Sequence, residues 1–92
     1  MMGEPRVQVD LMKTDAQRRV VLTTIGTRRD LERYGIELEE GLLLHLYTDD
    51  ADEDGNRDDI VFDGVVHYDQ DESRWVATID WGALRHESDQ QE

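Results

Sequence analysis

Two segments in the C-terminal half of the chain constrain the fold most strongly, because together they have the pattern of one β-hairpin. Residues 59–69 (DIVFDGVVHYD) and 74–81 (RWVATIDW) are rich in β-branched and aromatic residues, and only the polar stretch QDES separates them. If QDES forms a four-residue loop, Asp69 lies opposite Arg74, and the two-residue period of a strand sets the rest of the register. The pairs expected along one face are Tyr68–Trp75, Val66–Ala77, Gly64–Ile79 and Phe62–Trp81.

The composition of these pairs supports the register, since every pair on this face is apolar apart from the glycine. A shift of one residue would place charged side chains in the core. Gly64 is expected to permit the bulge or kink that a long, bent strand needs. The alternate residues of the first segment, beginning with Val61 and Asp63, are expected to point outward.

Three further segments have the composition of strands. Residues 6–12 (RVQVDLM) alternate apolar and polar side chains, residues 18–25 (RRVVLTTI) are rich in β-branched residues, and residues 41–48 (GLLLHLYT) form a third apolar run. In the core we expect Leu42, Leu44 and Leu46 to join Ile60, Phe62 and Val66.

One short helix is expected over residues 28–34. Thr27 followed by Asp30 resembles a capping box, and Gly35 stands where a C-terminal cap is expected. Residues 82–86 (GALRH) are expected to form one more helical turn.

Five short strands, one short helix and a final helical turn resemble the small β-barrel of SH3-like domains, in which a bent antiparallel meander closes on one core. The resemblance covers roughly residues 5–82 and rests on strand number and spacing, so it implies a fold and no functional residue. We therefore expect a mainly β domain with a small barrel of about five antiparallel strands; an α+β meander is the alternative. One domain is expected over residues 1–86, followed by a polar, disordered tail at 87–92.

The residue types exclude several classes of protein. The chain has no cysteine, which fits a reducing compartment and removes thiolate metal sites and cysteine nucleophiles. Its N-terminal residues lack the apolar run of a secretory signal, and no segment has the length and hydropathy of a membrane span. We expect a cytoplasmic protein without a membrane role. No cofactor fingerprint or complete set of catalytic residues is recognised, so an enzyme is not expected.

Negative charge is concentrated in the second half of the chain. Residues 1–46 contain seven Lys and Arg against eight Asp and Glu, whereas residues 47–92 contain three against fifteen, which together give the net charge of −13. Such a field repels nucleic-acid phosphates and attracts cations or basic proteins. An alternative needs no partner, because this surface composition also resembles that of proteins from salt-adapted, halophilic or marine organisms.

The acidic stretch DDADEDGNRDD, residues 49–59, supports two functional interpretations. The first is a surface for a basic protein segment, with Asp49, Asp50, Glu53 and Asp59 as the contact residues. The second is a calcium site, because alternate oxygen ligands followed by a glycine match the first half of a calcium loop. Its candidate ligands are Asp50, Asp52, Asp54, Asn56 and Asp58. The second half departs from the EF-hand pattern, since Val61 occupies the position of the bidentate glutamate.

The same strand register predicts a polar row on the outer face. His45, Asp63 and Asp80 are expected to lie side by side on three neighbouring strands, either as a cation or acid/base site or as a solvated exterior. From all these patterns we expect a non-catalytic, acidic interaction or accessory domain that recognises a basic protein segment in a salt-sensitive way. Calcium binding through residues 50–58 is the alternative. The chain is expected to be a monomer or a weak homo-oligomer.

Overall fold

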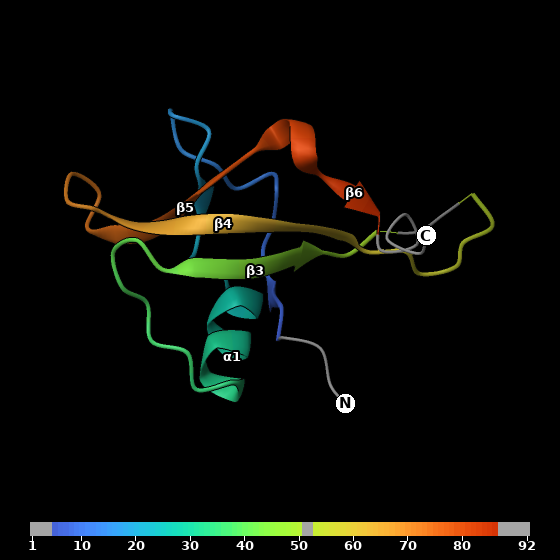
Figure 1. The fold of residues 1–92 in the computed structure, drawn as a ribbon, viewed down its shortest axis with the longest axis horizontal. Coiled ribbons are helices and arrows are strands. Elements are labelled where there is room, and N and C mark those ends of the chain that lie inside the picture. The colour runs from blue at the N-terminus through green and yellow to red at the C-terminus, as the bar shows by residue number, and fades with distance from the viewer. Residues whose placement is uncertain (1–4, 51–52, 87–92) are drawn as a thin grey trace.

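The computed structural model describes residues 5–50 and 53–86 and has the mainly β fold expected from the sequence. The strands form one sheet that curls into a half-barrel, with a single α-helix beside it and a turn of 3-10 helix near the C-terminal end (Figure 1). In chain order the elements are β1 (Val7–Gln8), β2 (Val20–Val21), α1 (Ile25–Arg33), β3 (Leu43–Thr48), β4 (Ile60–Asp69), β5 (Arg74–Ile79), η1 (Trp81–Ala83) and β6 (Arg85–His86). The one α-helix in the described residues is too short and too polar to cross a membrane.

The sheet is organised around β4, its longest strand. The strand order is β1-β3-β4-β5-β2, and β6 pairs with β4 beyond the end of β5. All neighbours are antiparallel except β1 and β3, which are parallel. The expectation of a purely antiparallel sheet is therefore wrong at this edge. Between β1 and β3 the chain forms β2 at the opposite edge and then α1, and a crossover of this kind brings a strand back parallel to an earlier one.

The hairpin register derived from the sequence is confirmed from Asp69 to Gly64. Asp69 lies opposite Arg74, and the apolar pairs extend to Gly64–Ile79. On the other side of β4, the ladder with β3 runs without interruption from Leu43–Val65 to Thr48–Ile60. Since neither ladder skips a residue at position 64, the expected bulge is absent there. A Cβ atom at Gly64 would lie 3.0 Å from side-chain atoms of both Ile79 and Leu46, so close packing of these side chains favours glycine here.

The register expected beyond Ile79 is wrong. β5 ends at Ile79, and Asp80 begins η1 by accepting a hydrogen bond from the Gly82 N–H at 3.0 Å. Phe62–Trp81 and Asp63–Asp80 are therefore not strand pairs, and β6 pairs instead with Ile60 and Val61. Part of the segment expected to be a helical turn, residues 85–86, is thus a strand. Val61, expected to point into solvent, is only 2% exposed.

The main hydrophobic cluster lies on one face of the sheet. It is built from valine and leucine side chains of β1, β2, β3 and β4 together with Phe62, Ala77 and Ile79. Trp75 and Trp81 pack against it from its margin, in agreement with their expected structural role. Both N-terminal strands are shorter than expected, but Val9 and Leu22 extend them with single backbone bonds to Tyr47 and Trp75.

The helix begins three residues earlier than expected, and the expected capping box is wrong. Thr24 is the N-cap residue, so that Thr27 and Asp30 lie inside the helix and are almost fully buried. Both side chains bind the backbone of Gln8 in β1: the Thr27 hydroxyl donates to the Gln8 carbonyl at 2.5 Å, and the Asp30 carboxylate accepts from the Gln8 N–H at 3.0 Å. The backbone N–H and carbonyl of Gln8, at the outer edge of β1, thereby have hydrogen-bond partners in the helix.

Removing the Asp30 carboxylate is expected to destabilise the domain. Asp30→Ala leaves the Gln8 N–H without its acceptor in a partly buried place, which costs about 1–3 kcal/mol of unfolding free energy. Glu32→Ala is the matched control, since Glu32 is exposed on the same helix, and it should change stability by about 0.5 kcal/mol or less. Urea unfolding of both variants measures the difference. Equal effects would show that the bond to Gln8 does not anchor the helix.

Candidate functional site

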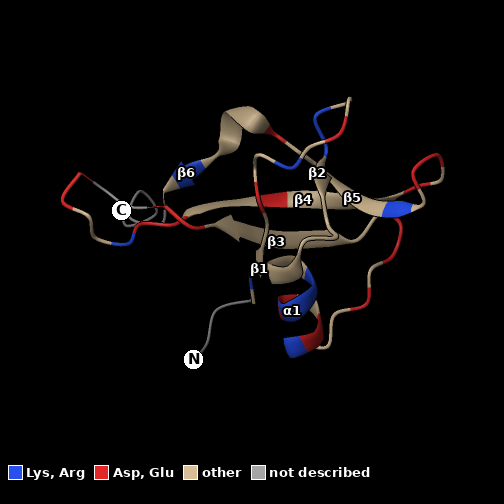
Figure 2. Ribbon diagram, turned by 180° about the vertical axis from the view of Figure 1, so that it is seen from behind, with Lys and Arg blue, Asp and Glu red and all other residues tan. Residues whose placement is uncertain are grey.

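Acidic residues gather at two opposite ends of the molecule. One group lies on the loop between β3 and β4, residues 49–59. The other lies where the 35–42 loop meets the β4–β5 turn, which both ribbon views place at the far end of the sheet (Figures 1 and 2). We call the second group the acidic end; its members are Glu37, Glu39, Glu40, Asp69, Asp71 and Glu72.

The 49–59 loop is closed by its own backbone. The Asp58 N–H donates to the Asp50 carbonyl at 3.0 Å, and Gly55 turns the chain with a φ of +85°. This closure brings together the first and last residues of the expected calcium loop. Asp52 lies outside the described residues, so the full ligand set cannot be assembled; among the residues that are described, no group of three His, Asp or Glu side chains is arranged to hold a metal ion.

Much of the charge on this loop is engaged internally. Asp59 is 8% exposed, and both of its carboxylate oxygens accept from Nε of Arg57, at 2.9 and 3.1 Å. This carboxylate raises the pKa of Arg57 above its usual range. Asp49 accepts from the Gln8 amide at 2.9 Å and lies 3.4 Å from Arg57, while Asp50 bonds His86 at 2.7 Å. Of the four expected partner-binding residues, Glu53 is exposed and forms no ion pair within residues 5–50 and 53–86.

The acidic end keeps more of its charge exposed. Asp69 is engaged, because it pairs with Arg19 at 3.3 Å and accepts the N–H groups of Asp71 and Glu72. Glu40 bonds His67 and the Tyr68 N–H. The remaining four carboxylates are exposed and form no ion pair with any residue of the ranges 5–50 and 53–86; they belong to Glu37, Glu39, Asp71 and Glu72.

An aromatic pair lies next to the β4–β5 turn, which carries Asp71 and Glu72. Tyr68 is 42% exposed, and its ring contacts Trp75 edge to face at a centroid distance of 5.0 Å. The cross-strand register that was expected from the sequence fixes this pair. Glu40 joins the two loops of the acidic end, since its carboxylate holds the Tyr68 backbone at 2.9 Å. Sequence reasoning missed this end because its acidic residues come from two segments about 30 positions apart.

The outer row expected from the register is partly confirmed. His45 pairs with Asp63 across β3 and β4, with 2.7 Å between Nδ1 and the carboxylate. Asp80 is not in the ladder, yet it lines a hollow of about 300 Å³ together with both of these residues. Arg6 and Arg85 also line this hollow. Neither arginine was expected here, because one precedes β1 and the other belongs to the unpredicted strand β6.

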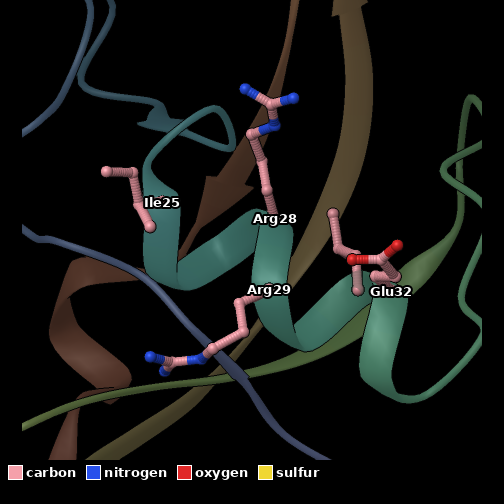
Figure 3. A pocket seen from close by; sticks show the side chains of 5 residues that line it. Ile25, Arg28, Arg29 and Glu32 are labelled. Carbon is pink, nitrogen blue, oxygen red and sulfur yellow. The ribbon is translucent and has the colours of Figure 1, made fainter.

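A wider depression of about 610 Å³ lies on the exposed side of α1 and is lined by Ile25, Arg28, Arg29, Leu31 and Glu32. Figure 3 shows that its labelled side chains diverge from the helix instead of converging on one point. Arg29 turns toward β1, where it bonds the Gln8 amide oxygen at 2.9 Å. Divergent side chains form a surface and do not assemble a set of ligands.

Comparison with known proteins gives no match: no family model fits the chain, and neither a curated protein nor a solved structure is significantly similar to it.

The bonds of Glu40 make the acidic end sensitive to acid. The Tyr68 N–H, and after it His67, hold the pKa of Glu40 below its ordinary value of 4.5. Because this pKa is lower in the folded than in the unfolded chain, the stabilisation is present above about pH 4.5 and is lost as the pH falls through the folded pKa. Unfolding free energies measured from pH 6 to pH 3 should fall less steeply in Glu40→Gln than in the unchanged protein. Glu39→Gln is the control; a matching loss of slope there would contradict the assignment.

Proposed function

We propose that this chain is a non-catalytic interaction domain that binds a basic segment of another protein. The proposal rests chiefly on the acidic end, which combines an exposed tyrosine, bonded through its backbone to Glu40, with four carboxylates that have no ion pair within the described residues. In a chain with a net charge of −13, such a surface attracts positively charged segments over several ångströms and favours fast association.

Tyr68 supplies a contact that charge alone does not. A lysine or arginine side chain can lie on the face of its ring, and the neighbouring carboxylates can accept hydrogen bonds from the same cation. Trp75 holds the ring edge to face, which limits the side-chain entropy that Tyr68 loses when a partner binds. The 49–59 loop is proposed as a weaker, secondary attraction, since Asp59 and Asp49 are already engaged by Arg57.

Binding of a labelled peptide rich in arginine and lysine, followed by fluorescence anisotropy, tests this function. Tyr68→Ala should weaken binding by about two- to fivefold, which corresponds to an exposed cation–π contact. Replacing the carboxylates in Glu39→Gln/Asp71→Asn should weaken binding further and reduce its dependence on salt.

The matched control is Glu53→Gln/Asp54→Asn, which removes the same number of charges from the 49–59 loop. It should have the smaller effect. A larger effect from the loop variant would move the binding surface to the loop. Binding that does not change with salt, or that is equally strong for a peptide with glutamine in place of its basic residues, would contradict the proposed function.

Calcium binding is a second candidate, and the closure of the 49–59 loop favours it. The bond from the Asp58 N–H to the Asp50 carbonyl places the two ends of the oxygen-rich segment together, as a calcium loop requires. If the loop binds calcium, chelated protein should gain thermal stability on addition of calcium, and Asp50→Asn/Asp58→Asn should lose that gain. Magnesium at the same concentration is the control. An unchanged unfolding temperature at millimolar calcium would remove this candidate.

A further inference from the structure

The hollow beside the outer row contains both positive and negative groups, which sets it apart from the acidic surface elsewhere. Its charged lining consists of Arg6 and Arg85 on one hand and Asp63 and Asp80 on the other, with His45 bonded to Asp63. We call it the Arg6 hollow. Its volume of about 300 Å³ is sufficient for a molecule of the size of an amino acid.

The fold brings these groups together from distant parts of the chain. Arg6 directly precedes Val7, and His45 directly precedes Leu46, the partner of Val7 in the parallel β1–β3 ladder. This alignment carries Arg6 to the side of His45, and the antiparallel β3–β4 ladder then places Asp63 on the other side. η1 and β6 complete the hollow by contributing Asp80, Ala83 and Arg85.

The guanidinium groups of the two arginines have no ion-pair partner in the part of the chain that the structure describes. Neither Arg6 nor Arg85 forms an ion pair with a residue in the ranges 5–50 and 53–86. Arg6 is moreover partly buried. Leaving a partly buried guanidinium without a carboxylate is unfavourable, above all in a chain that contains 23 acidic residues. An anionic group that enters the hollow would supply the missing acceptor, and a guanidinium binds a carboxylate through two parallel bonds.

The carboxylates of the same hollow decide the class of ligand. A simple anion bound by the arginines would also face Asp63 and Asp80, and like charges at short distance repel. Asp80 engages one oxygen with the Gly82 N–H at 3.0 Å, and a carboxylate can accept further bonds. A molecule with an ammonium group next to its carboxylate can bind the two arginines through the carboxylate and the two aspartates through the ammonium group.

We propose that the Arg6 hollow binds a small zwitterion of the α-amino acid class. The ligand carboxylate lies against Arg6 and Arg85, and its ammonium group lies against Asp63 and Asp80. This site is separate from the acidic end and does not depend on the proposed function.

NMR titration of ¹⁵N-labelled protein with L-alanine, L-leucine and L-phenylalanine tests the proposal. At least one of these probes should give saturable shifts that centre on His45, Asp63, Ala83 and Arg85. Acetate and methylammonium each carry half of the charge pattern, and they should bind at least tenfold more weakly than that amino acid. Equal binding of acetate would show an anion site only and would overturn the proposal, as would the absence of saturable shifts with all three amino acids.

Two arginine variants separate a binding role from a structural one. Arg6→Gln and Arg85→Gln should each weaken binding of the amino acid by about tenfold or more, since each removes charge-assisted hydrogen bonds to its carboxylate. Both variants should keep the dispersed amide spectrum of the folded protein. Arg28→Gln, which removes an exposed charge from α1, is the matched control and should bind as the unchanged chain does. Undiminished binding by both hollow variants would overturn the assignment.

Discussion

The pairing of β4 with strands on both of its edges is the interaction on which the rest of the structure depends. β3 covers one edge of β4, while β5 and then β6 cover the other. Gly64 belongs to both ladders, opposite Leu44 on one side and Ile79 on the other. A side chain at this position would crowd core side chains of both flanking strands, so the close packing of the core and the alignment of β4 are linked.

The acidic residues gather in loops at the two ends of this central strand. Within the described residues, the 49–59 loop, the 35–42 loop and the β4–β5 turn together hold most of the exposed carboxylates, and the molecule measures 42 Å along its longest axis. At physiological ionic strength charges are screened over roughly 8 Å, so the two acidic groups hardly repel each other. Repulsion within each group is reduced by internal partners, Arg57 at the 49–59 loop and Arg19 with His67 at the acidic end. Distance between the two groups and ion pairs within each of them therefore limit the repulsion that a large negative charge causes in this domain.

Sequence reasoning worked where a pattern allows one strand alignment and failed where the same residues fit two local structures. The β4–β5 register could be predicted because a four-residue loop and alternating apolar residues leave one acceptable alignment. The same logic placed His45 opposite Asp63. It failed after Ile79, because an aspartate that caps a 3-10 turn has the same sequence pattern as one that continues a strand.

The missed parts of the candidate sites share a physical cause, since each depends on a tertiary contact that no local pattern contains. Thr27 and Asp30 have the spacing of a capping box, but the parallel pairing of β1 offers their side chains the Gln8 backbone instead. Arg6 enters the outer row through the same parallel pairing. The acidic end likewise exists because Glu40 crosses to β4 from a separate loop.

The alignment of β4 can be measured directly from nuclear Overhauser contacts between protons of neighbouring strands. The structure requires Gly64 to lie opposite both Leu44 and Ile79, with Tyr68 opposite Trp75 and His45 opposite Asp63. Contacts that follow this alignment would support the arrangement on which the acidic end and the Arg6 hollow both rest. Contacts displaced by one residue, with Val65 opposite Ile79, would turn the side chains of β4 to the wrong faces and contradict the account.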